Sequence, residues 1–472
     1  MTRKKNQIIL EKVEVIDIGS KGRAIAKLEN GKKLFIENAV PGDICDVQVF
    51  KKRRSYLEGK AICFHELSSD RVEPVCEHFG TCGGCKWQQL DYAQQLIYKQ
   101  SSVAKSFLNE LSSEIKLPEI SPIVGSAKQY LYRNKLEYSF SANRWIPKEE
   151  LELEIEDRDR DALGFHIQGM WEKVLDINHC HLQEQPSNQI RLAVKKFAKD
   201  NGLPFYNLRY QSGLLRNLMI RTTSTQEVMA IFQFFEDDTE NIKKLLDYVI
   251  DGFPNLTSLM YVINKKSNDS FFDQDVILYH GRDYLIEEIE DLKFRIRPKS
   301  FFQVNAIQAC ELYKVARSFA QISRQDVVYD LYTGIGTIAQ FVARQAKKVV
   351  GIESIPQAIE DAKENAEVNQ LDNVDFFVGD IKDLLNDAFI QAHGLPQVVI
   401  TDPPRVGMHK DVVQKLLEIA APRIVYVSCN PDSQAKDLAL LCEKYDVTRV
   451  QPVDMFPQTP HVENVVLLEL KA

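Results

Sequence analysis

One stretch decides the fold of the C-terminal half of the chain, 327-VVYDLYTGIGT-337. Its first five residues favour a short strand, and Gly334 and Gly336 follow directly after it. Glycine accepts a positive φ and lets the backbone approach a ligand without an intervening side chain. The stretch therefore predicts a strand that turns tightly into a helix beside a ligand.

Short apolar runs alternate with helix-forming segments on the C-terminal side of this stretch. The runs are KVVGIES (348–354), VDFFVGD (374–380), QVVITDPP (397–404) and RIVYVSC (423–429), and the helical segments include TIAQFVARQA (337–346) and PQAIEDAKENAEVNQ (356–370). This alternation predicts a parallel sheet with helices on both faces, an α/β Rossmann-like domain over residues 296–472. Ligands bind at the carboxyl ends of the strands in such sheets, so we expect the functional groups there.

Two acidic residues end strands of this predicted sheet. Glu353 ends the strand after the glycine turn, and Asp380 ends the third strand. An acid at the first position can accept both hydroxyls of a ribose, whereas the lack of a full G-x-G-x-x-G argues against a pyrophosphate. A Gly-x-Gly turn alone indicates no more than packing. Together with Gly334 and Gly336, the two acids predict a nucleoside ligand such as S-adenosylmethionine.

Cys429 ends the strand RIVYVS, and Asp402 follows the strand QVVIT. A lone cysteine is by default a buried, inert residue. Methylation of carbon 5 of uracil, however, needs a thiolate that adds to carbon 6 and a carboxylate that later removes the hydrogen from carbon 5. Glu463, just before the strand VVLLEL, supplies such a carboxylate. A free thiol has a pKa near ~8.5, so this chemistry also needs local activation of the thiol.

The chain has nine cysteines, an odd and unevenly spaced set that does not indicate a disulfide framework. Cys76, Cys82 and Cys85 lie within ten residues, which indicates a metal or a cluster. Cysteine thiolates suit either zinc or an iron–sulfur cluster.

Two further domains are predicted before residue 296. Residues 1–64 alternate short β-rich runs with turns, which favours a small OB-like β-barrel, and KKRRSY (51–56) offers the basic and aromatic groups with which such barrels hold RNA. Residues 65–295 favour a second β-rich domain with one helix near 187–200. A further helix is predicted at 87–111, where it can pack on the C-terminal domain.

The composition is that of a soluble globular protein, with 44% hydrophobic and 27% charged residues. No apolar run reaches the ~18 residues of a membrane span, and the N-terminus does not resemble a signal peptide, so we expect a cytoplasmic protein. The net charge of −8 argues weakly against nucleic acid, but residues 1–60 carry +6. A basic module on an acidic body is compatible with binding a polyanion, although the same charges can simply solvate a small domain.

These motifs, together with 300-SFFQVN-305 and 461-HVE-463, resemble the RNA uracil-5 methyltransferase family over nearly the whole chain. The family often has Cys where this chain has Thr333, a small polar change from which we expect little effect. The resemblance implies that S-adenosylmethionine is bound by Gln303, Tyr332, Glu353 and Asp402. It also implies that Cys429 is the nucleophile and Glu463 the base.

The resemblance extends to the N-terminal half. Cys76, Cys82, Cys85 and Cys180 resemble the [4Fe–4S] site of the ribosomal-RNA branch, with His78, His179 and His181 as neighbours rather than ligands. Residues 1–64 resemble a TRAM domain, an RNA-binding module. YRNK (132–135) and LRNL (215–218) also match family segments, and for these both an RNA-binding and a structural role stay open.

The resemblance implies that a uridine of 23S ribosomal RNA is flipped into the catalytic pocket of a monomer, with the T-loop uridine of transfer RNA as the alternative. Two hypotheses of other classes remain. One is a non-catalytic RNA-binding iron–sulfur protein, which predicts that Cys429 and Glu463 are dispensable. The other is a methyltransferase for protein or a small molecule, which the D-P-P stretch alone would allow but which needs no Cys429 thiolate.

Overall fold

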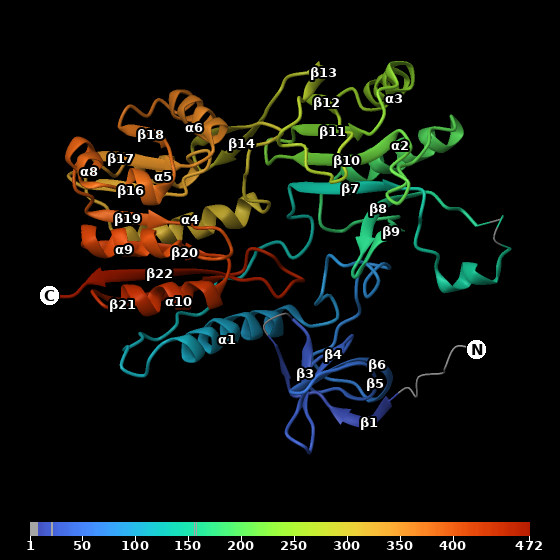
Figure 1. The fold of residues 1–472 in the computed structure, drawn as a ribbon, viewed down its shortest axis with the longest axis horizontal. Helices are drawn as coiled ribbons and strands as arrows, with labels where there is room; N and C mark the ends of the chain where they lie inside the picture. Colours follow the sequence, from blue (N-terminus) through green and yellow to red (C-terminus); the bar gives the residue numbers. More distant parts are fainter. Residues whose placement is uncertain (1–7, 20–21, 155, 157) are drawn as a thin grey trace.

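The computed structural model describes residues 8–19, 22–154, 156 and 158–472, which form three β-sheet units around a central gap (Figure 1). Residues 1–7 and 20–21 of the predicted N-terminal barrel lie outside the described residues. Within the described part of the chain, no helix combines the length and apolarity that a membrane crossing requires.

The first unit is a six-stranded sheet that curls around its own core. Its strands are β1 (Ile8–Glu14), β2 (Asp17–Ile18), β3 (Ala24–Lys27), β4 (Lys33–Glu37), β5 (Ile44–Lys52) and β6 (Tyr56–Glu66), in the order β1-β5-β6-β4-β3-β2. Alternate residues such as Leu34, Ile36 and Val47 point into the core and are fully buried.

The central unit is a seven-stranded sheet in the order β13-β12-β11-β10-β7-β8-β9. Its strands are β7 (Lys135–Ser141), β8 (Ala162–Ile167), β9 (Met170–Asp176), β10 (Leu215–Thr222), β11 (Val228–Phe234), β12 (Ser258–Ile263) and β13 (Ile277–Gly281). Two helices, α2 (Ser187–Asp200) and α3 (Thr239–Gly252), bury their apolar sides against one face of this sheet. The sequence predicted α2 but missed α3, so the expectation of a single helix was wrong.

The C-terminal unit contains the predicted parallel sheet. Its order is β18-β17-β16-β19-β20-β22-β21; the first five strands are parallel, β22 is antiparallel to them, and β21 is antiparallel to β22. The strands are β16 (Val327–Leu331), β17 (Lys348–Glu353), β18 (Val374–Val378), β19 (Val398–Thr401), β20 (Arg423–Ser428), β21 (Tyr445–Val453) and β22 (Glu463–Leu470). A hairpin of β14 (Leu285–Ile289) and β15 (Leu292–Ile296) packs in the same core.

Helices cover both faces of this sheet (Figure 1). They are α4 (Ala306–Ala320), α5 (Thr337–Ala343), α6 (Pro356–Val368), α7 (Ile381–Leu384), α8 (Asp387–His393), α9 (Lys410–Ile419) and α10 (Pro431–Leu441). The layering places the carboxyl ends of the parallel strands toward the middle of the molecule, where the predicted site residues lie.

Helix α1 (Tyr92–Glu110) follows the cysteine segment but packs on the C-terminal unit. It lies against α10, and Val103 and Phe107 are fully buried in the C-terminal core. A fully buried ion pair joins Lys99 Nζ to Asp454 Oδ1 at 2.5 Å. Helix α1 therefore connects the cysteine segment to the segment that precedes β22.

Candidate functional site

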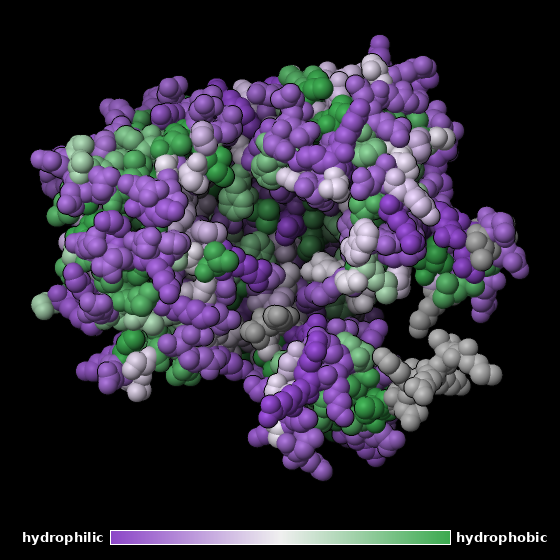
Figure 2. Space-filling view, in the orientation of Figure 1, coloured by the Kyte–Doolittle hydropathy of each residue, from purple (hydrophilic) through white to green (hydrophobic). Residues whose placement is uncertain are grey.

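A cavity of about 880 Å³ opens where the units meet, and Figure 2 shows the molecule hollowed there. One end, here called the acidic end, is lined by Gln303, Asp402, Cys429 and Glu463. A second part of the lining, here called the four-cysteine end, contains Cys76, Cys82, Cys85 and Cys180. Two sets of residues that the sequence predicted for separate purposes therefore share one cavity.

The sheet register brings Cys429 and Glu463 together. Strands β20 and β22 are antiparallel, and Ser428 pairs with Asn464 at the end of the ladder. Beyond this pair, Cys429 follows Ser428 on one strand and Glu463 precedes Asn464 on the other, so the two residues are neighbours across the ladder. Asn430 accepts a hydrogen bond from the Asp432 N–H at the start of α10, so the chain leaves the sheet directly after the thiol.

Burial dominates the electrostatics of Cys429. Burial, followed by the carboxyls of Glu463 and Asp402, raises the pKa of the thiol to about 11. The Arg405 guanidinium acts in the opposite direction and lowers this pKa. The thiol is therefore protonated in the free protein near neutral pH, and its activation depends on Arg405 and on whatever binds beside it.

Two buried carboxyls, Asp402 and Glu463, line the acidic end, and a third, Asp330, lies behind them and interacts with Asp402. Burial and the neighbouring Asp402 raise the pKa of Glu463 well above its usual value. Burial and Asp330 raise the pKa of Asp402 to about 7. Burial also raises the pKa of Asp330 to about 7, although Asp330 Oδ2 accepts hydrogen bonds from Thr333 Oγ1 and the Ala339 N–H. Such a set favours a positively charged ligand, because a cation would relieve the mutual repulsion of the carboxylates.

The glycine turn after β16 has the predicted shape. Tyr332, Gly334 and Gly336 have positive φ angles of 63°, 56° and 79°. A Cβ at Gly334 would meet no atom within 4 Å, so the backbone there is open to a ligand. A Cβ at Gly336 would lie 2.6 Å from Phe376 Cζ, so that glycine is required for packing.

The two acids of the predicted nucleoside site lie along the same strand-end edge. Glu353 is the last residue of β17, and its Oε2 accepts a hydrogen bond from the Gly334 N–H at 3.3 Å. Strand β18 ends at Val378, two residues earlier than the sequence predicted, and Asp380 is exposed and caps α7. Tyr332, Gly334, Gly336, Glu353 and Asp380 do not line the cavity, whereas Gln303 and Asp402 do.

Some side chains that the sequence did not single out also reach the cavity. They include Arg405, Phe456, Thr459 and His461, for which no role was predicted, although His461 belongs to the HVE motif. The loop that carries the last three is held from α1: Lys99 Nζ donates to Phe456 O at 3.0 Å, in addition to its pair with Asp454.

The cysteine segment also contacts this loop. Gln458 O accepts hydrogen bonds from the N–H groups of Lys86 at 2.8 Å and Trp87 at 3.0 Å. The residues directly after Cys85 are thus bonded to the loop that leads to Glu463. No sequence pattern predicts these contacts, because they join segments far apart in the chain.

The four cysteines at the other end of the cavity are free thiols. Burial, together with the neighbouring thiols, raises the pKa of Cys85 to about 12 and that of Cys180 to about 11. Among the described residues, the only three Cys, His or carboxylate ligand atoms within 4.8 Å of one another belong to Asp46, Cys63 and His65 on the N-terminal sheet. The four thiols are therefore close enough to affect one another's pKa values, but no three of their sulfur atoms lie within 4.8 Å of one another.

The comparisons with known families match both ends of the chain. The family described as tRNA (uracil-5-)-methyltransferase matches residues 271–471, and the TRAM domain matches residues 10–62. An uncharacterized RNA methyltransferase of Bacteroides thetaiotaomicron is 52% identical over 457 residues, which are 96% of this chain and 100% of that protein. A second one, from Porphyromonas gingivalis, is 48% identical and covers 97% of this chain and 99% of its own length.

One solved structure is similar over almost the whole chain. It is the tRNA (uracil-54, C5)-methyltransferase of Pyrococcus abyssi in complex with S-adenosyl-L-homocysteine. The two chains are 25% identical, with a TM-score of 0.76, and the likeness covers 97% of this chain and 100% of the other. All three units of the fold are thus similar to those of a known enzyme.

Proposed function

Because the chain belongs to the RNA uracil-5 methyltransferase family and carries its TRAM domain, we propose that Cys429 is the covalent nucleophile of uridine methylation and Glu463 the base. The observation that carries this proposal is the placement of the two side chains on adjacent strand ends in one cavity. The cavity is large enough for a flipped-out nucleoside.

The residues divide the reaction as follows. The Cys429 thiolate forms a bond to carbon 6 of the uracil, and the displaced electron pair passes to the ring as an enolate. S-adenosylmethionine supplies the methyl group as an electrophile. Once carbon 5 is methylated, the Glu463 carboxylate takes its hydrogen as a proton. The electron pair of that bond restores the carbon 5–carbon 6 double bond, and the thiolate leaves.

The chain also fits the methyl donor. The open backbone at Gly334 and the strand-end carboxylate of Glu353 suit a nucleoside. The buried carboxyl of Asp402, whose pKa is raised to about 7, suits a ligand with a positive charge. We propose Gln303, Tyr332, Gly334, Gly336, Glu353, Asp380 and Asp402 as the residues that bind it.

We also propose that Cys76, Cys82, Cys85 and Cys180 hold a [4Fe–4S] cluster. In a tetrahedral zinc site with Zn–S bonds of ~2.3 Å, the sulfur atoms lie about 3.8 Å apart. No three of these four described sulfurs lie within 4.8 Å of one another, so their spread supports the larger iron–sulfur group. Bound there, the cluster would supply a fixed framework for the segment that contacts Gln458.

The test of the cluster is independent of activity. The protein purified without oxygen should contain iron and sulfide in equal amounts and absorb visible light, and Cys180→Ser should lose most of both. Cys442→Ser, at a buried thiol outside the cavity, is the matched control and should retain them. Zinc in place of iron in the wild-type protein would show that the cluster assignment is wrong.

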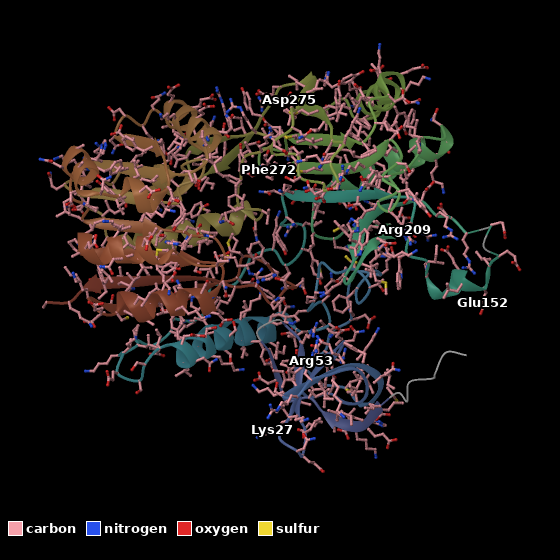
Figure 3. The ribbon with its side chains drawn as sticks, in the orientation of Figure 1. Lys27, Arg53, Glu152, Arg209, Phe272 and Asp275 are labelled. Carbon is pink, nitrogen blue, oxygen red and sulfur yellow. The ribbon has the colours of Figure 1, made fainter. Side chains whose placement is uncertain are left out.

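The favoured substrate is 23S ribosomal RNA, because the four cysteines and the TRAM domain occur together, as in the ribosomal branch of the family. Arg53 lies on the side of the N-terminal sheet nearest the other units and Lys27 on the far side (Figure 3), so the basic segment 51–56 can face an RNA in the gap. The similarity to a transfer-RNA enzyme favours the alternative, the T-loop uridine. Mass spectrometry of both RNAs from a deletion strain distinguishes them, and loss of the methyl group from transfer RNA alone would contradict the first choice.

The central experiment traps the covalent intermediate. Protein is incubated with S-adenosylmethionine and RNA transcripts containing 5-fluorouridine. Fluorine cannot leave as a proton, so a denaturation-resistant protein–RNA adduct should accumulate with the wild type and be absent with Cys429→Ala. Adduct formation that persists in Cys429→Ala would show that another residue is the nucleophile.

A further inference from the structure

A second cavity, of about 640 Å³, lies on the central sheet. Tyr138 and Phe140 of β7 are buried against the helix-covered face, so Ser139 between them faces the opposite side. Ser139 pairs with Asn217 of β10, and both line this second cavity. It therefore opens on the side of the sheet away from α2 and α3.

The second cavity adjoins the one that contains Cys429. His166 and Gln168, at the end of β8 and in the turn after it, line both cavities. Ile167, between these two residues, forms a β-bridge with Cys82, so the second cavity meets the first at the four-cysteine end. An RNA strand whose target unit lies beside Cys429 can therefore extend through the first cavity and place another unit in the second. A free small molecule would have no need of this continuity.

The lining of the second cavity combines apolar side chains with polar groups that are poorly satisfied. Asn217 is only 4% exposed, and its amide donates to Ser139 Oγ over a long 3.4 Å. The hydroxyl of Tyr206, also 4% exposed, has no hydrogen-bond partner among the residues that the structure describes. Buried polar groups that are poorly satisfied in this way gain from a ligand that offers hydrogen bonds.

Arg216, the residue before Asn217, supports the wall instead of facing a ligand. Its guanidinium stacks on the Tyr206 ring at 4.8 Å and donates to Asn264 O and Lys266 O, both at 2.7 Å. These bonds hold the loop from which Asn268 and Asp269 line the cavity. Of the LRNL segment, Arg216 thus has a structural role, and Asn217 is the residue placed for recognition.

The chemistry of this cavity fits a nucleobase. An amide offers a donor and an acceptor side by side, the pattern with which asparagine recognises base edges. Trp171 lies at the rim with 61% of its surface exposed, although an indole gains from burial, and it can stack on a base. Arg209, next to Leu208 in the wall, projects at the edge of the central unit, where it can meet a phosphate (Figure 3).

We propose that this second cavity binds another base of the RNA strand that carries the target uridine, with Asn217 contacting the edge of the base and Trp171 stacking on it. The proposal rests on the proposed function, because it needs an RNA strand held in the first cavity. It assigns to the central sheet a part in choosing which uridine is methylated, since the second base is read together with the first.

The first test uses RNA transcripts that contain 5-fluorouridine and a low fraction of photoreactive 4-thiouridine. The Cys429 adduct fixes the strand, near-ultraviolet light then crosslinks it, and mass spectrometry identifies the peptides. Crosslinks to the peptides that contain Trp171 or Asn217 support the proposal. Adduct formation with crosslinks elsewhere only would overturn it, whereas the absence of any adduct would overturn the proposed function itself.

The second test compares Trp171→Ala with Tyr279→Ala in the full chain. Both aromatics lie on edge strands of the same sheet, β9 and β13, but Tyr279 is outside the second cavity. Trp171→Ala should raise the KM for RNA about tenfold with kcat unchanged, because base stacking contributes to binding only. Asn217→Ala should do the same and should also relax the preference for one base at another position of the strand. Equal KM values for Trp171→Ala and Tyr279→Ala would overturn the proposal.

Discussion

Five thiols face one cavity and burial raises the pKa of each, yet the groups around them differ. Cys429 lies between two carboxyls and one guanidinium, from Arg405. The thiols of the four-cysteine end are close to one another, and each disfavours ionisation of the next. Burial alone therefore does not separate a nucleophile from a metal ligand.

The two ends differ in the positive charge that can stabilise the ionised thiols. At the four-cysteine end only a multivalent cation can neutralise four thiolates at once, so these thiols suit permanent ligation. At Cys429 a single guanidinium offsets part of the penalty, and the carboxyls beside it oppose it. That thiolate is therefore formed only when the site is filled, which suits a nucleophile that must bond and then leave.

The largest effect is expected from removing one thiol from each end in turn. Cys429→Ala should lower turnover by a factor on the order of 10⁴ or more and leave the iron content unchanged, because the thiol bonds to substrate but not to the cluster. Cys180→Ser should have the opposite profile, with iron lost. Turnover under saturating RNA and iron analysis on the same preparations check this. A Cys429→Ala protein that loses its iron would show that the two ends are not separable.

The next largest effect concerns the base. Glu463→Gln keeps the shape of the side chain but cannot accept the proton, so turnover should fall by about 10²- to 10⁴-fold. Because the nucleophile is intact, a methylated RNA–protein adduct should accumulate on ordinary uridine. The adduct is measured by denaturing electrophoresis with a radiolabelled methyl group, and Glu469→Gln, at the other end of β22, is the matched control. Wild-type turnover by Glu463→Gln would exclude this carboxyl as the base.

The sequence predicted much of this site because strand ends of a parallel sheet share one edge. The glycine turn after Leu331 and the abrupt stop after Cys429 were visible as short apolar runs followed by Gly or Pro. Helix α3 could also have been predicted, since Ile242, Leu245, Leu246 and Val249 recur at helical spacing and are buried as expected.

The meeting of the two thiol sites could not be predicted. It depends on the antiparallel register of β20 with β22 and on the packing of three units, neither of which leaves a local pattern. The role of Lys99 was equally invisible: its helix has ordinary composition, and its partner Asp454 lies in a distant segment. Contacts between distant segments follow from tertiary packing, which a single sequence does not encode in its periodicity.

The buried pair tests the link between the two ends. Lys99→Met should lower the free energy of unfolding by about 3–5 kcal/mol, because Asp454 is left as an uncompensated buried charge. Lys105→Met, on the same helix, breaks an exposed pair with Asp17 and should cost at most about 1 kcal/mol. Chemical denaturation of both variants measures the difference. Equal losses would mean that Lys99 does not hold the loop before Glu463.

The last comparison is the pH dependence that separates Cys429 from the ligated thiols, and its smallest effect is expected at Arg405. The pKa of Cys429 is raised to about 11, so the thiolate fraction of the free enzyme rises about tenfold for each pH unit below that value. The single-turnover rate of methyl transfer at low RNA concentration should therefore rise with the same slope from about pH 6 to about pH 8.5.

Arg405→Gln removes the cation that lowers this pKa, so the variant should keep the slope but react several-fold more slowly at every pH. The iron content of both proteins should stay constant over this range, because a thiolate bound to metal no longer titrates there. A flat rate profile for the wild type would mean that Cys429 is already ionised before RNA binds. In that case burial would raise the pKa of Cys429 less than it raises the pKa values of the other four thiols. The two ends of the cavity would then differ in thiol ionisation already in the free protein, before substrate binds.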